Sequence, residues 1–508
     1  MSSEWQLTTL GAICSTQGGA IQTGPFGSQL HTSDYKEIGV PVVMPTNIGD
    51  GGIAVEGIAR IDQEDVERLQ QHKLQLDDIV FSRRGDVTKN ALVRAHEAGW
   101  LCGTGCLKVR LGDQTTANAK FISYCLRLPD TKEWLIRHAV GATMPNLNTG
   151  ILSAVPIILP PLSLQLEIAE ILAALDDRIT LLRETNATLE AIAQALFKSW
   201  FVDFDPVRAK AEGRARQDGE RSGQPRMPQA SDLPRPGAEA GSEAQGQPEG
   251  AIQGSMSAAE GTTAGMPEVG QRREQLPRMP KAAMDATTAA LFPDSFEESE
   301  LGLVPKGWLL SALGDAFEIN PTRKLKKGDF APYLDMASVG TQGHVVDGVV
   351  GREMGSGTKF INGDTLLARI TPCLENGKTA YVDFLDAGQV GWGSTEFVVL
   401  RPKAPLPPYY GYLLARHPAF RDHAIQSMSG TSGRQRIQND VLGRYPVAIP
   451  PPEVAEAFAG IVQSAQQRIA ANQEQAQTLT QLRDTLLPRL ISGQLRLPEA
   501  EATVEEVL

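Results

Sequence analysis

The feature that most constrains this chain is a duplication within its own sequence. The stretch "WQLTTLGAIC" begins at Trp5 and "WLLSALGDAF" begins at Trp308, and "AVPIILPP" (154–161) is matched by "RYPVAIPP" (444–451). In both copies a long mixed region leads to a pair of prolines, and a segment of helical periodicity follows. We therefore expect the 508 residues to contain two copies of one architecture, within the two or three domains that such a length can hold.

The segment after each proline pair has the heptad spacing of a coiled coil. Its apolar residues recur mostly at alternating steps of four and three, which places them on one seam of a helix. One asparagine stands in each seam, and a polar seam residue can fix register at some loss of stability. The matched registers favour pairing of the two helices over the alternative, amphipathic helices lying on a globular core. The seam residues are Ile168, Leu172, Leu175, Ile179, Leu182, Asn186, Leu189 and Leu196 in the first helix, and Val462, Ile469, Asn472, Leu479 and Leu486 in the second.

The region ahead of each helix is predicted to be α+β. Short apolar runs with turn residues at their edges, "DDIVFSRRGD" and "GDTLLARITP", are typical of strands, as are "GCLKVRL" and "STEFVVLRP". The stretches "KFISYCLRL" and "YYGYLLARH" are better read as short helices. Each half is therefore expected to be strand-rich with a few short helices.

The two copies are separated by a segment of a different composition. It has no aromatic residue and is dominated by Gly, Ala, Pro, Glu, Gln and Arg, so it cannot bury enough apolar surface to offset its ordering entropy, and we expect disorder. The expected organisation is a first strand-rich domain at 1–160, a coiled-coil helix at 161–206, a disordered linker at 207–290, a second strand-rich domain at 291–450, a second coiled-coil helix at 451–497 and an acidic tail at 498–508.

Composition favours a cytoplasmic protein. The N-terminus has no apolar signal region, no apolar run is long enough to span a membrane, and five cysteines are few for this length. The net charge of −12 argues weakly against nucleic acid as a partner. However, phosphate contacts depend on local basic patches rather than on the average over the chain.

The triplet Gly377-Lys378-Thr379 raises the question of nucleotide binding. A phosphate-binding loop needs a glycine six residues before the lysine, and position 372 is proline instead. The following "AYVDFL" is strand-like, so no helix N-terminus is expected there to hold an anion. The sequence therefore disfavours an NTPase.

Polar and basic loops recur at matched places in the two halves. Aligning Asp78 with Asp364 places basic residues after a strand in both copies, and two further loops rich in Gly, Asn, Thr, Gln or Arg precede the proline pairs. Arginine and lysine neutralise phosphates and bond to guanine, and amides read adenine. The alternatives are surface ion pairs and ordinary turns. The candidate DNA contacts are Arg83, Arg84, Lys89, Asn146, Asn148, Arg369, Lys378, Arg434, Gln435 and Arg436.

No catalytic or metal site is expected. Cys102 and Cys106 have no second Cys/His pair at ligand spacing nearby, and His96 alone is not enough for zinc. No methyltransferase, dinucleotide or triad motif is visible. We therefore predict no catalytic residue, no metal and no cofactor on this chain.

Four stretches, in order on a duplicated frame, resemble a known family. They are "VPIILPPLSLQLEIAEILAALDDRI", "ALFKSWFVDFDPVRAKAEG", "LFPDSFEESELGLVPKGW" and "GDTLLARITPCLENGKTAYV". The chain resembles the specificity (S) subunit of type I restriction–modification systems over nearly its whole length, except for the linker.

The resemblance implies two target-recognition domains, separated by two long helices that pair antiparallel. Each domain is expected to read one half of a split, asymmetric site in double-stranded DNA. The helices would set the spacing and dock two modification (M) subunits, which carry S-adenosylmethionine and methylate adenine. Restriction (R) subunits, with ATP and Mg²⁺, would join to cleave DNA.

Two departures and one alternative remain. The linker is longer than the resemblance leads us to expect, and the second helix lacks a counterpart of Gln165, which bears on whether both helices dock their partners alike. The alternative function is a coiled-coil scaffold or adaptor with no role in reading DNA.

Overall fold

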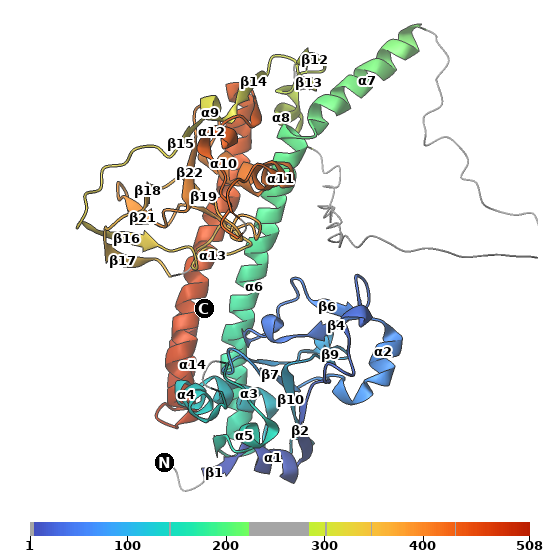
Figure 1. Ribbon diagram of the computed structural model, residues 1–508, viewed down its shortest axis with the longest axis vertical. Helices are drawn as coiled ribbons and strands as arrows, with labels where there is room; N and C mark the ends of the chain where they lie inside the picture. The colour runs from blue at the N-terminus through green and yellow to red at the C-terminus, as the bar shows by residue number, and fades with distance from the viewer. Residues whose placement is uncertain are drawn as a thin grey trace, which may run out of the picture. The chain divides into compact units, whose positions relative to one another are not determined.

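The computed structural model of the chain describes residues 5–141, 144–222, 284–299, 302–346, 348–431 and 433–507, with the backbone alone for 215–222. These residues form two compact units. Unit 1 comprises Met1–Asn186 with Ala471–Leu508, and unit 2 comprises Ala187–Ala470. The two longest helices, α6 (Leu162–Phe201) and α13 (Pro452–Ile491), each contribute one part to unit 1 and the other to unit 2 (Figure 1).

Unit 1 contains a five-stranded sheet in the order β2-β10-β7-β8-β5 and a four-stranded sheet in the order β3-β6-β4-β9. The strands are β2 (Gly18–Thr23), β3 (Tyr35–Lys36), β4 (Val40–Val43), β5 (Asp50–Gly51), β6 (Ala59–Ile61), β7 (Ile79–Ser82), β8 (Asn90–Leu92), β9 (Leu101–Cys102) and β10 (Cys106–Gly112). A further strand, β1 (Gln6–Thr9), pairs antiparallel with β11 (Pro156–Leu159). All four residues of β7 are buried, as expected for the apolar run that the sequence marks as a strand.

Unit 2 repeats most of this topology, but its described residues include no counterparts of β3 and β5. Its sheets have the orders β15-β22-β19-β20 and β17-β16-β21-β18. The strands are β15 (Phe317–Ile319), β16 (Phe330–Leu334), β17 (Val350–Glu353), β18 (Thr358–Phe360), β19 (Thr365–Ala368), β20 (Thr379–Tyr381), β21 (Gly391–Gly393) and β22 (Phe397–Pro402). Here β14 (Leu309–Ala312) pairs with β23 (Pro446–Ile449), as β1 does with β11. Even the parallel pair recurs, as β4 with β9 and β16 with β21. The predicted α+β repeat is thus confirmed.

In each unit one short helix precedes the main sheet and three follow it, while α2 of unit 1 has no counterpart among the described residues of unit 2. In unit 1 they are α1 (Leu10–Thr16), α2 (Gln63–Arg68), α3 (Ala119–Arg127), α4 (Pro129–His138) and α5 (Thr149–Ser153), with short 3-10 turns at Thr32–Asp34, Pro45–Asn47, Gln70–His72 and Ala95–Glu97. In unit 2 they are α9 (Leu313–Ala316), α10 (Pro408–Arg416), α11 (Pro418–Gln426) and α12 (Asn439–Leu442). Pro129 and Pro418 each begin the second helix of a pair, because proline restricts the residue before it to extended backbone and suits the first helical turn.

The long helices run antiparallel where they meet. In unit 1, Asp176 of α6 bonds to Arg483 of α13 at 2.7 Å, and Asn186 accepts from Asn472 at 2.8 Å, so residue numbers rise along one helix as they fall along the other. In unit 2 the rings of Trp200 and Phe458 lie 5.7 Å apart. Antiparallel pairing of α6 with α13 is therefore present in unit 1, and the two helices are also in contact in unit 2.

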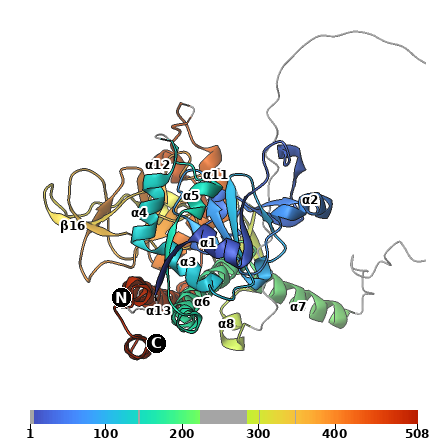
Figure 2. The ribbon, with the colours of Figure 1, turned by 90° about the horizontal axis from the view of Figure 1, so that it is seen from below.

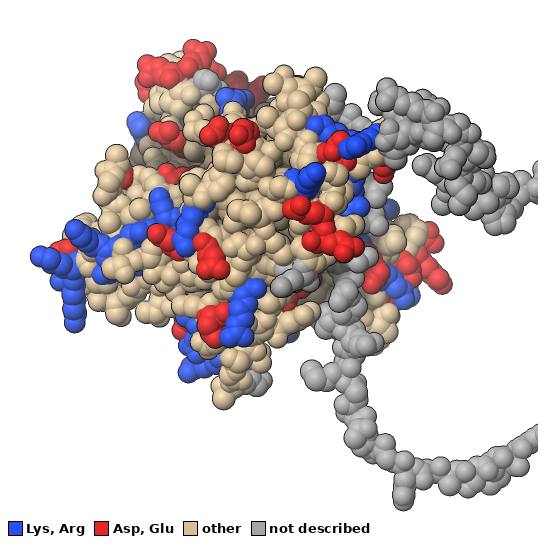
Figure 3. All heavy atoms as spheres, turned by 90° about the horizontal axis from the view of Figure 1, so that it is seen from above, with Lys and Arg blue, Asp and Glu red and all other residues tan. Residues whose placement is uncertain are grey.

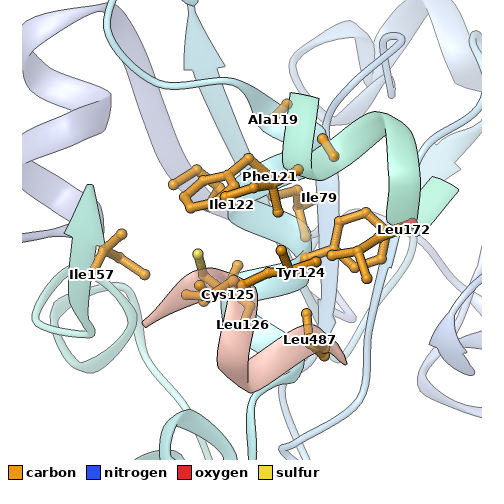
Figure 4. Close-up of a cluster of buried hydrophobic side chains, with 14 of the residues drawn as sticks. Ile79, Ala119, Phe121, Ile122, Tyr124, Cys125, Leu126, Ile157, Leu172 and Leu487 are labelled. Carbon is orange, nitrogen blue, oxygen red and sulfur yellow. The ribbon is translucent and has the colours of Figure 1, made fainter. Parts of the chain in front are cut away.

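The core of unit 1 unites these helices with the sheet. Tyr124 and Leu126 of α3, Leu172 of α6 and Leu487 of α13 belong to one buried cluster (Figure 4). Seen from below, α3 lies beside the ends of α6 and α13 (Figure 2). Because each fully buried leucine contributes about 1.5–3 kcal/mol, this shared cluster holds the strand-rich part of unit 1 on its helices.

In unit 2 the stretch "ALFKSWFVDF" builds an aromatic cluster at the end of α6. Phe201 and Phe204 lie 5.8 and 5.6 Å from the ring of Trp308, and Phe201 meets Phe458 of α13 at 4.7 Å. Such edge-to-face and tilted contacts add about 0.5–1.5 kcal/mol per pair to the burial itself. Trp308, the first residue of the second repeat, is thereby tied to both long helices.

One expectation needs correction. The linker was expected at 207–290, but α7 (Asp205–Ser222) and α8 (Ala286–Ala290) are helical, while 223–283 lie outside the described residues. Ala, Glu, Arg and Lys favour helix, and Lys210 donates to the carbonyl of Phe292 at 2.5 Å, which anchors the start of α7. A hairpin of β12 (Phe296–Ser299) and β13 (Gly302–Pro305) follows. The acidic tail is also a helix, α14 (Leu497–Glu505), with Ala500 and Val504 buried in the core of unit 1.

Candidate nucleic-acid interface

In unit 1 the end of β7 meets the loop that precedes α5. The carbonyl of Arg83 accepts a hydrogen bond from the backbone of Leu147 at 2.9 Å, and Arg84 forms a β-bridge with Asn146. The guanidinium of Arg83 also donates to the side chain of Asn146 at 3.3 Å. Two candidate segments far apart in sequence therefore form one surface.

Unit 2 builds the same arrangement at the end of β19. The carbonyl of Arg369 accepts from the backbone of Ile437 at 3.0 Å, and Ile370 bridges to Arg436. Arg369 also donates through its guanidinium to the carbonyl of Ile437 at 2.8 Å. The predicted equivalence of Arg83 and Arg369 agrees with this pairing, since both residues meet the loop in the same way. We call the two assemblies strand-end sites 1 and 2.

A buried aspartate paired with arginine lies at the start of each of these two strands, and the sequence reasoning missed the pairing. Asp78, just before β7, accepts two hydrogen bonds from Arg110 at 2.7 and 2.6 Å. Asp364, just before β19, is fully buried and accepts from Arg401 at 2.6 Å and from Arg323 at 3.1 Å. Both aspartates also bond to the backbone three residues earlier, so each fixes the turn that enters the strand.

Some candidate side chains form hydrogen bonds within the protein, and others have no partner among the described residues. Arg83 and Arg369 are held as described, Lys378 donates to the carbonyl of Met336 at 2.7 Å, and the side chain of Asn148 caps α5 by accepting from Ile151 at 2.8 Å. The exposed side chains of Arg84, Lys89 and Arg434 have no partner among the described residues. These three are therefore the charges at the strand-end sites that are free to meet a ligand.

Glu396 is a further component that the sequence did not reveal. It lies directly before β22 and holds the guanidinium of Arg436 with two oxygens, at distances from 2.7 to 3.1 Å. The hydrogen bond from Arg436 lowers the pKa of the Glu396 carboxyl, so the pair is charged at neutral pH. Gln435 is held beside it through its backbone, which bonds to Thr371 at 3.0 and 3.1 Å.

The Gly377-Lys378-Thr379 triplet is not a phosphate-binding loop. Gly377 has a positive φ of 78° in a turn, and Thr379 begins strand β20 instead of a helix. The backbone carbonyl of Lys378 accepts from Ala368, as that of Lys89 does from Ser82, which makes the two lysines structural equivalents. The triplet is thus the second copy of a strand connection.

The described residues show no group of histidine, cysteine and carboxylate side chains arranged to hold a metal ion. Cys102 and Cys106 are buried free thiols, and burial raises the pKa of Cys102 to about 12. Among the described helices, none has the length and apolar character needed to cross a bilayer.

The predicted helix seam is largely buried. Ile168, Leu172, Leu175, Ile179, Leu182, Val462, Ile469, Asn472, Leu479 and Leu486 are buried, and Asn186, Leu189 and Leu196 are half-buried. Gln165 is fully buried as well, and its side chain bonds to Asn118, Thr116 and Pro160. In the second helix the equivalent position is Ala455, which is also buried. The difference between glutamine and alanine at this position therefore affects packing inside each unit, and it is not direct evidence about how a partner docks.

Charge is mixed on the face that Figure 3 shows. Figure 3 shows lysine and arginine side chains interspersed with aspartate and glutamate on the face seen from above. In such a setting the local pairing of each basic side chain decides whether it can neutralise a phosphate.

Comparison with known proteins identifies relatives along most of the chain. The family model described as the type I restriction modification DNA specificity domain matches residues 2–191 and 305–488. The HindI specificity subunit of a type I restriction enzyme from Haemophilus influenzae is 25% identical over 404 residues, covering 74% of this chain and 77% of that one. The MjaIX specificity subunit from Methanocaldococcus jannaschii is 23% identical over 398 residues, covering 75% and 70%. A solved S subunit of a type I restriction-modification system from M. genitalium aligns over 96% of both chains, at 14% identity and a TM-score of 0.46. The two ranges matched by the family model correspond to the two copies of the duplication.

Proposed function

This chain belongs to the type I restriction modification DNA specificity family, and on that premise we propose that it reads a bipartite, asymmetric site in double-stranded DNA. In this proposal unit 1 reads one half-site and unit 2 reads the other. The chain recognises DNA and leaves the chemistry to partner subunits.

The observation that carries the proposal is the repetition of the strand-end site. Each unit brings a basic strand end against a polar loop by the same backbone bonds, Arg83 to Leu147 and Arg369 to Ile437. The side chains that these bonds present differ between the copies, with Asn146 in one place and Arg436 in the other. Two domains that recognise different DNA sequences need the same backbone arrangement with different side chains on it, and the two strand-end sites have this property.

The side chains have the chemistry for this task. Amides pair with adenine through its N6 and N7, and arginine pairs with guanine through O6 and N7, with about 1–3 kcal/mol of discrimination for each good pair. Asn146 supplies the amide in unit 1, and Gln435 with Arg434 and Arg436 supplies amide and guanidinium groups in unit 2. Lys89 and Arg84 are suited to the phosphate backbone.

Partner subunits complete the proposed complex. We expect two M subunits, which bring S-adenosylmethionine for adenine methylation, and R subunits, which bring ATP and Mg²⁺ for cleavage. This expectation rests on family membership, and the paired helices α6 and α13 are the elements proposed to dock the M subunits and set the spacing of the half-sites.

The alternative is a coiled-coil scaffold that does not read DNA. The buried seam of α6 and α13 suits such a role, but it does not explain why two basic strand ends are presented by the same bonds. The DNA-reading proposal accounts for both features.

The experiment is protection of DNA by the chain in complex with its M subunits. We expect protection of two short blocks with an unread spacer between them, at an affinity that falls steeply as salt rises. Protection of a single continuous block, or equal binding to all sequences, would contradict the proposal.

A further inference from the structure

A basic surface in unit 2 lies outside the strand-end site. The segment "TRKLKKGDF" leads into β16, and Lys324, Lys326 and Lys327 are all exposed. Arg352 on the neighbouring strand β17 is exposed too, and β16 pairs with β17 so that Arg352 lies opposite Ala331. The turn that carries the lysines is attached to the same β16–β17 hairpin, because the backbone N–H of Gly328 donates to the carbonyl of Met354 at 2.8 Å. We call Lys324, Lys326, Lys327 and Arg352 the basic arm.

The charges of the basic arm are not neutralised. None of its four side chains has an acidic partner among the described residues, and Asp329, the nearest acid along the chain, accepts from the backbone of Lys326 at 2.7 Å. Glu353 lies opposite Phe330 at the end of the hairpin. Figure 3 shows lysine and arginine side chains projecting on the side where β16 and β17 lie in Figure 1.

The arm is also held in shape. The guanidinium of Arg352 lies 4.9 Å from the ring of Tyr333 and 5.9 Å from that of Trp392, and Trp392 donates to the carbonyl of Arg352 at 3.3 Å. A stacked guanidinium loses less rotamer freedom when it binds. Phe330, 76% exposed, leaves an uncovered ring beside the lysines.

Unit 1 provides an internal comparison, because its second sheet has no such arm. There β3 covers the outer edge of β6, the counterpart of β17. Three basic residues near this edge have partners, Lys36 with Asp62 at 3.9 Å, Arg68 with Asp65 at 2.6 Å, and Arg60 with the carbonyl of Gly39. In unit 2 the edge strand β17 is uncovered and all four of its residues are exposed.

We propose that the basic arm of unit 2 is a sequence-independent contact for the phosphate backbone of duplex DNA, separate from the base-reading strand-end sites. This inference rests on the proposed function and adds to it an asymmetry between the units. Unit 2 holds the duplex by charge in addition to reading it, whereas the matching edge in unit 1 is covered by β3 and Lys36 and Arg68 beside it are paired with carboxylates.

The test measures the salt dependence of binding to a labelled duplex of arbitrary sequence, so it needs no knowledge of the target site. The full-length chain is compared with the triple variant Lys324→Gln, Lys326→Gln, Lys327→Gln. Removing one lysine–phosphate interaction reduces the slope of log affinity against log salt by about 0.9, so we expect a slope shallower by about two to three. Replacing the same three lysines by arginine should retain the wild-type slope.

A matched control removes three charges from unit 1, where each is paired with a carboxylate. Lys36→Gln, Lys132→Gln and Arg137→Gln together break pairs with Asp62, Asp50 and Glu133 and should leave the slope unchanged.

Four results would overturn the inference. An unchanged slope in the arm variant, with aggregation instead, would mean that the lysines only protect an open sheet edge. A change in slope on some arbitrary duplexes but not on others would make the arm a base reader. A loss of partner-subunit binding at constant slope would make it a protein-docking surface. If the wild-type chain shows no salt-dependent DNA binding at all, the proposed function fails with it.

Discussion

At the scale of single residues, Arg434 is the clearest candidate for reading a base. It is exposed in the loop beside the paired Arg436 and has no partner among the described residues. Arg434→Ala should therefore weaken binding of the specific site by about 1–3 kcal/mol while leaving binding to unrelated DNA nearly unchanged. Competition binding with specific and random duplexes measures this difference.

The control for that prediction is Arg444→Ala. Arg444 is also exposed, but it faces Asp440 at 3.8 Å on a neighbouring turn. We expect no change in specific binding from it. An equal loss for all DNA sequences in Arg434→Ala would show that this arginine touches only phosphate.

Asp176 is the residue on which the packing of unit 1 most visibly depends. Its carboxylate accepts from Tyr124 and Arg127 of α3 at 2.9 Å and from Arg483 of α13 at 2.7 Å. Burial alone would raise the pKa of Asp176, but Arg127 and Arg483 outweigh burial and hold the pKa below its usual value. Asp176→Asn should destabilise unit 1 by about 3 kcal/mol, because it leaves the buried guanidinium of Arg127 without a counter-charge, while Arg483 keeps only Asp484.

The lowered pKa of Asp176 gives this effect a defined pH dependence. A group whose pKa is lower in the folded state stabilises the fold above its unfolded pKa of about 3.9, and this contribution is lost as the pH falls through the folded pKa. The stability difference between wild type and Asp176→Asn should thus be full at neutral pH and shrink below about pH 4. Asp177→Asn, on the exposed side of the same helix, should show neither effect.

Several residues of the candidate site could not have been found from the sequence. The partners Glu396 and Arg436, and likewise Asp78 and Arg110, are brought together by strands that are distant in the chain. Periodicity reports the face of one element and carries no information on which distant residue lies opposite. The matched aspartates, Asp78 and Asp364, could be recognised in the sequence because they align the two copies. Nothing in the sequence identified the arginines that pair with them.

At the scale of elements, the paired asparagines in the helix seam make a direct prediction. Asn472 is 3% exposed and donates to Asn186 at 2.8 Å. Asn186→Leu should lower stability by about 1–3 kcal/mol, because the amide of Asn472 loses this acceptor in a buried place.

Replacing both asparagines by leucine should recover that loss but weaken the preference for a single register. Thermal unfolding measures the first effect, and hydrogen exchange along α13 measures the second. The exposed Gln481→Leu on the same helix serves as the control. If Asn186→Leu were as stable as wild type, the hydrogen bond between the two asparagines would not contribute to the stability of the helix pair.

Elements with strong local patterns were predictable, and those stabilised by distant partners were less so. The strands β7, β10, β19 and β22 and the helices α3 and α10 follow from apolar runs and turn residues. Helix α14 was missed although Leu497, Ala500 and Val504 have helical spacing, because the acidic residues between them dominate the composition. Helix α7 was missed because low hydrophobicity was taken to mean disorder, whereas contacts from Val207 and Lys210 anchor its start.

At the scale of the whole molecule, the proposed role of α6 and α13 as a spacer predicts a change in the DNA site. The units divide between Asn186 and Ala187 on α6 and between Ala470 and Ala471 on α13. Two heptads inserted at both places add about 21 Å of helix, the rise of about six base pairs. We expect the unread spacer to lengthen by about this amount, as determined by mapping methylated adenines, and an unaltered spacer would contradict the role.

The central claim is that each unit reads its own half of the site. The measurement that tests it most directly replaces residues 1–160 by the corresponding segment of a relative with a different specificity and maps the methylated adenines in cells carrying both M and S subunits. The account predicts that one half-site changes to that of the relative while the other half-site remains. A change in both half-sites, or in neither, would contradict it.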